Sequence, residues 1–486
     1  MKRIISFSLA LLMLLSMFVG CTKDEQVENE DTAEVSTGNE LEGKYPDTVG
    51  DATFDGAECI LLTRDKDYLS EYWGAEGADA SMLDAAVYAR NVEVQERLDI
   101  TLTQLTKDLQ EVQVFIRNDA LSGDQSFHIV GSYAYVEPML ALEGLFYNIK
   151  DIPYINLSYP WYSEKFVNAA TISDKLFMVA CDWGYSQHEN TGGTLVNYDM
   201  LKRMGITDDL TSVVLDGKWT LEYFKTLVAN SWQDDNGDGI QDANDTYGLM
   251  VSRGMAPVDL LMFGVGYKFS DFDANGNLVA VMNSAMNVDR FEAVHNLFHK
   301  TDGVMYNEKY FLDMPIIDSF VNEKTIFAFQ PMYQVRQTIS ATEFDYGCLP
   351  MPKYDDNQSE YLSFVQDSFS LMSVSYKVTN LEMVGAVMET MSRKTYIDIR
   401  PVLFENIYET RYSENEQEAA VYDIILNSGA FDFIAIHTVC LDQPFFKVRS
   451  ALQNSTNTYA STMKSYNTQL GVRTKILLDN YKKIGS

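Results

Sequence analysis

Cys59-Ile-Leu-Leu-Thr63 begins a region in which strand and helix patterns alternate. This short apolar run is typical of a strand that is buried on both faces. Helical periodicity follows at residues 81–98, then an alternating strand at 100–105, a helix at 109–121 and a second apolar strand, His128-Ile-Val-Gly-Ser132. Strands that alternate with helices predict a parallel sheet with right-handed crossovers. We therefore expect an α/β fold.

A second series of strand and helix patterns follows along the chain. Apolar runs near 176–180 and 195–198 predict two further strands, and residues 220–232 have the periodicity of a helix. Further helices are expected at 287–300, 380–392, 415–427 and 447–482. About 430 such residues exceed the usual size of one hydrophobic core, so the sequence predicts two lobes.

The N-terminal residues have the pattern of a bacterial export signal. Lys2 and Arg3 precede an apolar run from residue 4 to residue 19. This run is shorter than the roughly 20 residues that a membrane-spanning helix needs. Gly20-Cys21 resembles the lipobox of bacterial lipoproteins, which implies that residues 1–20 are removed and that the Cys21 thiol is diacylated. Two acyl chains would anchor the protein, extracytoplasmically, to the outer face of the cell membrane. The alternative is a secreted protein with a cysteine at this position by chance.

Acidic residues dominate the mature chain. Removal of Lys2 and Arg3 with the signal reduces the 37 basic residues to 35, against 70 acidic residues, so the net charge is −35. Such a surface repels nucleic acid and anionic lipid head groups, because both are bound through Lys and Arg. Residues 22–51 carry ten acidic residues and two lysines. We expect residues 21–51 to form the lipidated start and a disordered, solvated spacer.

Six local signatures, in order, resemble the extracellular solute-binding proteins of ABC importers, in the sugar-binding group with large clostridial-type lipoprotein members. The matching segments are Pro160-Trp161 through Lys175-Leu-Phe177, Gly193-Thr-Leu-Val-Asn-Tyr-Asp-Met-Leu201 with Met204-Gly-Ile206, Lys218-Trp-Thr-Leu-Glu-Tyr-Phe224, Phe320-Val-Asn-Glu-Lys-Thr-Ile-Phe-Ala-Phe329, Tyr346-Gly-Cys-Leu-Pro-Met-Pro-Lys-Tyr354 and residues 375–391. Two of these depart from the family pattern. Thr325-Ile-Phe327 replaces small residues, and Asn197-Tyr-Asp199 replaces a Tyr-Asn-Lys sequence, which weakens any transfer of ligand contacts.

The resemblance implies a two-lobed fold of the periplasmic-binding-protein type (type II). Each lobe would contain a mixed or parallel sheet, and ligand would bind in the cleft and close the lobes about a hinge. We expect residues 52–155 and 318–362 to form the first lobe. Residues 156–317 and 363–486, with the C-terminal helices, would form the second. The implied protein is a monomer that binds an oligosaccharide and delivers it to the transmembrane subunits of an ABC permease.

Candidate ligand-binding residues follow the ends of predicted strands, where ligands sit in open parallel α/β sheets. Sugar rings pack on flat aromatic side chains, and their hydroxyl groups need donors and acceptors. Trp183 and Tyr185 are candidate platforms, although most of the 60 aromatic residues must belong to the core. The full predicted set is Arg64, Asp65, Tyr133, Asp182, Trp183, Tyr185 and Gln330.

Residues 234–245 have the spacing of a twelve-residue EF-hand-type calcium loop. The predicted oxygen ligands are Asp234, Asn236, Asp238, Ile240 through its carbonyl, Asp242 and Asp245. Asp245 departs from the usual glutamate at the last position. A structural Ca²⁺ is expected, and the alternative is an acidic turn-rich loop without metal. Residues 271–276 superficially repeat the pattern but are better explained as a hairpin with an Asn-Gly turn.

Catalytic motifs are lacking. The sequence contains no G-x-S-x-G, H-E-x-x-H or phosphate-loop motif, and we predict neither an enzyme nor a catalytic cofactor. His295 and His299 lie one helical turn apart, and we interpret them as structural. Three alternatives remain open. They are a binder of peptides or another polar solute, an extracellular glycan-active enzyme, and an adhesin or sensory protein without an importer.

Overall fold

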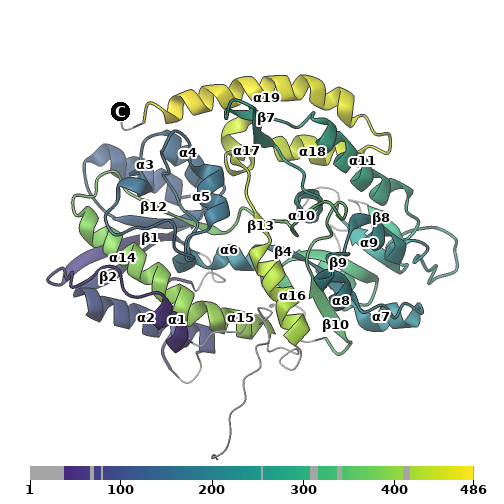
Figure 1. Cartoon of the computed structure of the whole chain (residues 1–486), viewed down its shortest axis with the longest axis horizontal. Helices are drawn as coiled ribbons and strands as arrows, with labels where there is room; N and C mark the ends of the chain where they lie inside the picture. Colours follow the sequence, from purple (N-terminus) through teal and green to yellow (C-terminus); the bar gives the residue numbers. More distant parts are fainter. Residues whose placement is uncertain are drawn as a thin grey trace, which may run out of the picture.

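The computed structural model describes residues 38–65, 71–77, 80–252, 256–306, 316–335, 342–408 and 416–484. Figure 1 shows two lobes side by side, with the long helix α19 (Tyr459–Tyr481) lying across both. The predicted signal peptide, Cys21 and the spacer up to residue 37 lie outside the described residues. Within the described ranges, no helix combines the length and apolarity needed to cross a bilayer.

The first lobe is built on a four-stranded sheet in the order β12-β3-β1-β2. Its strands are β1 (Ala57–Arg64), β2 (Ile100–Lys107), β3 (Ile129–Tyr133) and β12 (Ser370–Val374). β1 runs parallel to β2 and β3, and β12 pairs antiparallel with β3. The helices α2 (Met82–Leu98) and α3 (Val112–Ser122) provide the crossovers. The predicted parallel β-α-β-α-β unit is therefore confirmed.

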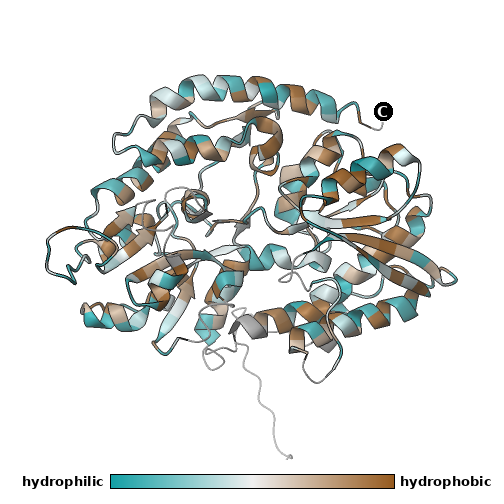
Figure 2. Ribbon diagram, turned by 180° about the vertical axis from the view of Figure 1, so that it is seen from behind, coloured by the Kyte–Doolittle hydropathy of each residue, from teal (hydrophilic) through white to brown (hydrophobic). Residues whose placement is uncertain are grey.

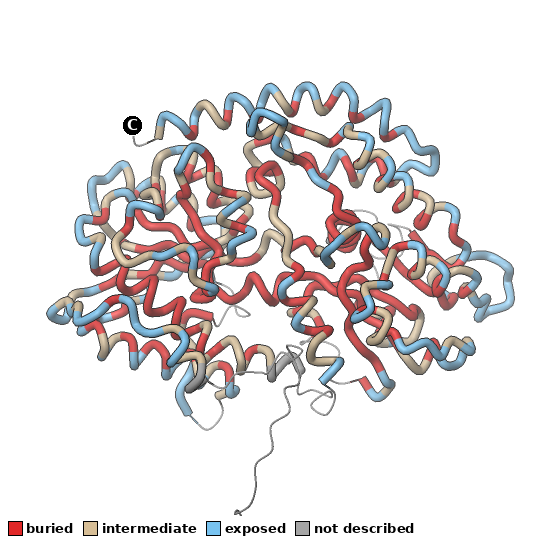
Figure 3. The backbone as a smooth tube through the Cα atoms, viewed as in Figure 1, coloured by how far each residue is buried: buried red, intermediate tan, exposed pale blue. Residues whose placement is uncertain are grey.

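The second lobe contains a five-stranded mixed sheet in the order β10-β4-β9-β5-β8. Its strands are β4 (Gly192–Asn197), β5 (Tyr247–Val251), β8 (Val304–Tyr306), β9 (Thr325–Pro331) and β10 (Tyr346–Leu349). β5 pairs in parallel with β8 and β9, whereas β4 is antiparallel to β9 and β10. The strands of both lobes are predominantly apolar in Figure 2, and most of their residues are buried in Figure 3.

The remaining elements cover these sheets and connect them. The helices are α1 (Gly38–Lys44), α4 (Glu137–Leu142), α5 (Glu164–Ala170), α6 (Ser186–Glu189), α7 (Tyr198–Arg203), α8 (Leu210–Leu215), α9 (Leu221–Val228), α10 (Ala256–Gly264), α11 (Ala285–Lys300), α12 (Ile316–Val321), α13 (Met332–Gln334), α14 (Leu381–Lys394), α15 (Arg400–Tyr408), α16 (Glu416–Asn427), α17 (Phe433–Ile436) and α18 (Pro444–Gln453). Short helical turns are η1 (Ile149–Asp151), η2 (Asp182–Gly184), η5 (Thr438–Leu441) and the π-helical η4 (Thr395–Ile399). Two small ladders pair β6 (Ser270–Phe272) with β7 (Leu278–Ala280) and β11 (Ser363–Phe364) with β13 (Gly429–Ala430).

Two segments that cross between the lobes lie next to each other. α6 leads from the first lobe into β4, and residues 363–369 lead back from the second lobe into β12. Gln366 N–H donates to the Asn190 carbonyl at 2.9 Å, and Thr191 forms an antiparallel bridge with Val365. Figure 3 shows the α6 segment as buried backbone between the lobes. Paired crossing segments of this kind form the hinge region.

The predicted division into lobes is wrong in three ranges. Residues 318–362 were expected in the first lobe, but they contain β9 and β10, which pair within the second sheet. Residues 156–181 were expected in the second lobe, yet Trp161 and Phe166 are buried with the core of the first sheet. Residues 363–486 are divided, because β12 and α14 return to the first lobe. Local patterns predict elements but do not specify which sheet edge a returning strand joins.

The predicted disordered spacer, residues 21–51, includes residues that fold as part of the first lobe. Residues 38–44 form α1, and Val49 is buried in the first-lobe core. Glu42 pairs with Arg393 at 2.5 Å and with Lys394 at 3.3 Å on α14. These cations lower the pKa of the Glu42 carboxyl against the opposing effect of its burial. At least one acidic residue of the predicted spacer, Glu42, therefore forms ion pairs with α14 instead of serving only to keep the segment solvated.

Candidate ligand-binding cleft

A cavity of about 710 Å³ lies between the two lobes. Pro160, residues 162–165 and Asp182 line it from the first lobe, and Val214, Leu215, Gly217, Lys353 and residues 359–361 line it from the second. Residues from α6, the first residue of α15 and the end of α16 complete the lining. Its volume is within the range of typical small-molecule sites, about 300–1,000 Å³.

The first-lobe wall is organised around the buried carboxylate of Asp182. Its main chain is fixed because Asp182 N–H donates to the Trp161 carbonyl at 2.8 Å. The His188 Nε2–H donates to Asp182 Oδ1 at 2.9 Å, and Gln187 Nε2 lies 3.4 Å from the same oxygen. Arg400 Nη1 lies 3.8 Å from Asp182 Oδ2. Two side chains from α6 and one from α15 therefore surround a single carboxylate.

Arg400 is held in place by more than this carboxylate. Its guanidinium packs on the rings of Tyr396 and Phe404, with centroids 5.2 and 5.0 Å away. Its Nη2 donates to Asn427 Oδ1 at 3.2 Å, at the end of α16. Arg400 therefore connects the Asp182 wall with the second-lobe side of the cavity. Cation–π packing of this kind fixes a guanidinium without removing its free N–H donors.

The second-lobe wall presents Tyr361 and Lys353. The Tyr361 hydroxyl donates to the Val214 carbonyl at 2.9 Å, which fixes the ring, and burial raises its pKa to about 12. The Lys353 ammonium lies 5.3 Å from the centroid of this ring. The adjacent Gly217 has φ of 68°, and a Cβ there would lie 3.5 Å from Lys353 Nζ. An aromatic face and a cation thus stand side by side at the cavity surface.

A further charged pair joins the two lobes across the cavity. Lys165 Nζ on α5 lies 3.2 Å from Glu360 Oε2 in the second lobe. It also donates to the Asn427 carbonyl at 3.1 Å. Both side chains are largely exposed, so the pair contributes little to stability. It nevertheless marks where the two lobes approach each other at the edge of the cleft.

Trp183 and Tyr185 do not serve as platforms in this arrangement. The Trp183 side chain has no exposed surface and packs edge-on against Tyr72, with ring centroids 6.2 Å apart. Tyr185 is 2 % exposed and belongs to the hydrophobic core. Neither lines the cavity, because the chain turns at η2 and directs the polar side chain of Asp182, rather than the rings, toward it. Their predicted contact with a sugar is contradicted by this burial.

The other predicted residues also lie away from this cavity. Arg64 is buried, donates to the Ser368 carbonyl and stacks over Tyr133, with its guanidinium 5.0 Å from the ring centroid. Asp65 is exposed beyond the end of β1, and Gln330 is buried in β9. Of the seven predicted residues, Asp182 alone is among the described residues that line the cavity. Asp182 itself lies in η2, after a segment with only an isolated bridge at Val179, so the strand-end rule did not locate the cavity.

The sequence reasoning missed Lys165, His188, Lys353, Tyr361 and Arg400. They come from the N-terminal turn of one helix, the short crossing helix, a loop and the first residue of α15. One local signal was available: Pro350-Met-Pro-Lys-Tyr354 was recognised as a family signature, and its lysine reaches the cavity. The other positions depend on how distant segments meet.

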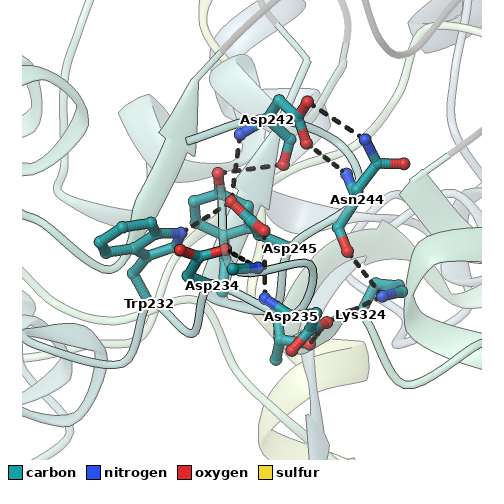
Figure 4. A network of polar contacts seen from close by, with 10 residues as sticks. Trp232, Asp234, Asp235, Asp242, Asn244, Asp245 and Lys324 are labelled. Carbon is teal, nitrogen blue, oxygen red and sulfur yellow. Dashed lines mark hydrogen bonds and ion pairs between the residues drawn. The ribbon is translucent and has the colours of Figure 1, made fainter. Parts of the chain in front are cut away.

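The predicted calcium loop folds as a compact acidic turn (Figure 4). The Asp234 carboxylate accepts hydrogen bonds from the backbone N–H groups of Gly237 and Gly239 at 2.6 and 2.8 Å. Gly237 and Gly239 have φ of 77° and 73°, as the tight turn requires. Asp238 Oδ1 accepts from the Ile240 N–H at 2.8 Å. These carboxylates therefore cap backbone N–H groups within the turn.

Asp245, at the last position of the predicted calcium loop, is hydrogen-bonded by another side chain of the protein. Asp245 is fully buried, and its carboxylate accepts from Trp232 Nε1 at 2.9 Å. Lys324 bridges Asp235 and the Asn244 carbonyl, each at 2.8 Å. Within the described ranges, no group of three or more His, Cys, Asp or Glu side chains is arranged to hold a metal ion. The oxygen-rich donor set suits Ca²⁺, and occupancy stays a prediction.

Two further sequence interpretations find direct support. His295 and His299 each direct Nε2 to a backbone carbonyl, of Asn454 at 2.8 Å and of Leu452 at 2.7 Å, which fits a structural role. The segment at 271–276 is a hairpin of β6 and β7 in which Gly276 has φ of 77°. The hairpin interpretation is therefore confirmed.

Comparisons with known proteins agree with this architecture. No protein-family model and no curated protein matches the sequence. Several solved structures do match the fold. A sugar transporter protein from Rhizobium etli, solved in an open conformation, has 12% identity and a TM-score of 0.58, over 85% of this chain and 99% of that one.

Two sugar-binding proteins give similar values. The cyclic α-maltosyl-1,6-maltose binding protein from Arthrobacter globiformis has 12% identity and a TM-score of 0.57, over 87% of this chain and 100% of that one. This chain has the fold of ABC-transporter sugar-binding proteins. The galacto-N-biose/lacto-N-biose I-binding protein of the ABC transporter from Bifidobacterium longum has 10% identity and a TM-score of 0.56, covering 88% and 98%. The predicted two-lobed α/β fold is therefore confirmed, and the likeness at this identity concerns the fold alone.

Proposed function

We propose that the protein is the substrate-binding component of an ABC importer and that it binds a carbohydrate between its lobes. The observation that carries this proposal is the inter-lobe cavity, which combines a fixed aromatic ring, Tyr361, with charged and polar groups. Sugars need such a combination because their rings offer apolar C–H faces and their rims carry hydroxyl groups. The fold shared with sugar-binding proteins supports the same conclusion.

Binding would be coupled to closure of the lobes. The paired crossing segments at 186–192 and 363–369 provide a hinge, and the ligand would contact both walls only in the closed form. The closed form would then be recognised by the transmembrane subunits of a permease. The lipobox-like Gly20-Cys21 supports anchoring of a monomer at the outer face of the membrane, which keeps it near such a partner.

A thermal-shift screen of the purified protein against mono- and oligosaccharides, amino acids and peptides tests the proposal. A ligand that binds the folded state alone stabilises it by about 2.7 kcal/mol at a hundredfold excess over Kd. We expect a shift with a carbohydrate that is lost in Tyr361→Ala and retained in Trp183→Phe. A shift with peptides or amino acids alone would favour the binder of another polar solute. The absence of a thermal shift with every compound tested would contradict the proposal.

Incubation of the protein with a carbohydrate that binds in the thermal-shift screen tests the alternative that it is an enzyme. The cavity contains Asp182, Glu164 and Glu360, so carboxylate pairs are present. Asp182 is already engaged by His188 and Arg400, and Glu360 by Lys165, which favours binding over acid–base chemistry. Chromatography of a bound oligosaccharide after prolonged incubation should return it intact. Cleavage products that disappear in Asp182→Asn would instead establish a glycan-active enzyme.

We also propose that the loop at 234–245 binds a structural Ca²⁺. Support comes from the twelve-residue spacing, the glycine at its sixth position and the oxygen-only side chains. No residue of the loop lines the cavity, and the loop contacts Lys324 and Trp232. Its role would therefore be to stabilise the second lobe.

A further inference from the structure

The charged side chains of the cleft differ in whether they have partners. Lys165 pairs with Glu360 at 3.2 Å, and Arg400 lies 3.8 Å from Asp182. Glu164 is exposed at the start of α5 and remains hydrated. These charges are therefore either neutralised by the protein or solvated.

Lys353 is different. It is 5 % exposed, and it forms no ion pair or side-chain hydrogen bond within the described part of the chain. Its backbone is fixed from both sides, because Lys353 N–H donates to the Trp219 carbonyl at 3.1 Å and its carbonyl accepts from Leu221 N–H at 2.7 Å. Its ammonium lies at the cavity wall, beside the Tyr361 ring and Gly217. A rigid support thus holds a nearly buried, unpaired cation toward the cavity.

Closure of the lobes would make this arrangement unfavourable without a partner. Water in the open cleft solvates the ammonium, but closure about a ligand removes that water. An unpaired charge in a water-excluded site is costly, whereas a charge-assisted hydrogen bond to an anion is among the strongest polar contacts. The cleft carboxylates Asp182 and Glu360 are already engaged by other side chains, Glu164 is exposed to water, and no carboxylate among the described residues pairs with Lys353.

We propose that the natural ligand is an acidic carbohydrate whose anionic group, a carboxylate or a sulfate ester, binds the Lys353 ammonium. The sugar ring bearing this group would pack on Tyr361, because the ammonium lies 5.3 Å from that ring's centroid. A chain with a net charge of −33 repels anions at most of its surface, so recognition of an anion depends on a local cation. This inference rests on the proposed function and specifies its substrate class.

Isothermal titration calorimetry with matched ligand pairs tests the inference. One arm compares oligogalacturonides and glucuronate-containing disaccharides with their methyl esters, in which an added methyl group removes the negative charge of each carboxylate. The second arm compares sulfated and unsulfated disaccharides. We expect the acidic member of one pair to bind about tenfold or more tightly, as a charge-assisted contact predicts. The arm that shows the preference identifies the anionic group.

The Lys353→Met variant keeps the length of the side chain and removes its charge. In this variant the acidic and neutral members should bind with affinities that agree within about threefold. Lys165→Met is the matched control, because Lys165 lines the same cavity but is already paired with Glu360, and the preference should persist.

Three results would overturn the inference. They are equal affinity for acidic and neutral members in the unmodified protein, tighter binding of the neutral member, and a preference that survives in Lys353→Met. In each case carbohydrate binding itself would still support the proposed function. Failure of every carbohydrate, acidic or neutral, would contradict the proposed function as well.

Discussion

The first-lobe and second-lobe walls of the cleft both carry charge, but they compensate it differently. On the first wall, the buried Asp182 carboxylate is contacted by His188 and Arg400. On the second wall, the Lys353 ammonium has an aromatic neighbour but no carboxylate within the described residues. The difference indicates that the first wall is a preformed part of the fold, whereas the second wall is completed by the ligand. Substitutions on the two walls should therefore differ in their effects on stability.

Substitution of Asp182 should have the largest effect. Asp182→Ala removes the acceptor for His188 and leaves the Arg400 guanidinium without its carboxylate. Loss of one partner from a buried charged pair costs about 3–5 kcal/mol, so we expect the free energy of unfolding to fall by roughly 3 kcal/mol. Urea denaturation followed by circular dichroism measures it.

Asp65→Ala is the matched control for this substitution. Asp65 was predicted from the same kind of strand end, but its side chain is exposed and does not line the cavity. We expect its unfolding free energy to change by less than about 0.5 kcal/mol and ligand affinity to be unchanged. Similar losses in both variants would show that Asp182 is not the organising group of its wall.

The contrast between Asp182 and its neighbours explains what sequence reasoning achieved. Local patterns predicted β1, β2 and β3 with the helices between them, because the periodicity of burial is local information. The predicted strand at 176–180 forms only an isolated bridge at Val179, and β5, β8 and β10 were not predicted. Asp182 was selected because it follows the apolar run at 176–180, but that run forms no strand of either sheet, and Asp182 lies at the start of η2. The burial of Trp183, one residue further, depends on its packing against Tyr72 from a distant segment. Lys353 follows β10, and Arg400 begins α15. Both reach the cleft only because these elements join particular lobes, which the sequence patterns did not specify.

The loop at 234–245 carries the carboxylates for which we proposed a structural Ca²⁺. If this loop binds Ca²⁺ with a Kd of about 10⁻⁴–10⁻³ M, 2 mM Ca²⁺ should stabilise the protein by roughly 0.7–1.8 kcal/mol. Differential scanning calorimetry with and without a chelator measures the shift in Tm. Asp238→Ala should abolish this shift.

Asp273→Ala is the control for the calcium prediction. Asp273 occupies the similar sequence at 271–276, where it accepts hydrogen bonds within the hairpin of β6 and β7. The calcium-dependent shift should be retained in this variant. A Tm that is insensitive to the chelator, or equal shifts in Asp238→Ala and the unmodified protein, would contradict a calcium site.

The connection between the two walls contains an acid whose charge is disfavoured. Burial, reinforced by the nearby Asp259 carboxylate and opposed by Arg449, raises the pKa of Asp367 from 3.8 to about 6. The folded state therefore holds a proton more tightly than the unfolded state. The free energy of unfolding should fall as pH rises from about 4 to about 6, by on the order of 1 kcal/mol because partial exposure reduces the effect. Asp367→Asn should remove this slope in pH-dependent urea denaturation, and an unchanged slope would assign it to other groups.

Lys353→Met should have the smallest effect on stability. The sign of its change in unfolding free energy distinguishes the second wall from the first. An unpaired, nearly buried ammonium contributes no stabilising ion pair, and an apolar side chain of similar length avoids its desolvation. We expect the free energy of unfolding to stay constant or to rise by up to about 1 kcal/mol, whereas the Asp182→Ala variant loses stability. Urea denaturation without ligand measures both variants under the same conditions. A loss of more than about 1 kcal/mol in Lys353→Met would mean that this ammonium is part of the fold, and the second wall would then be preformed like the first.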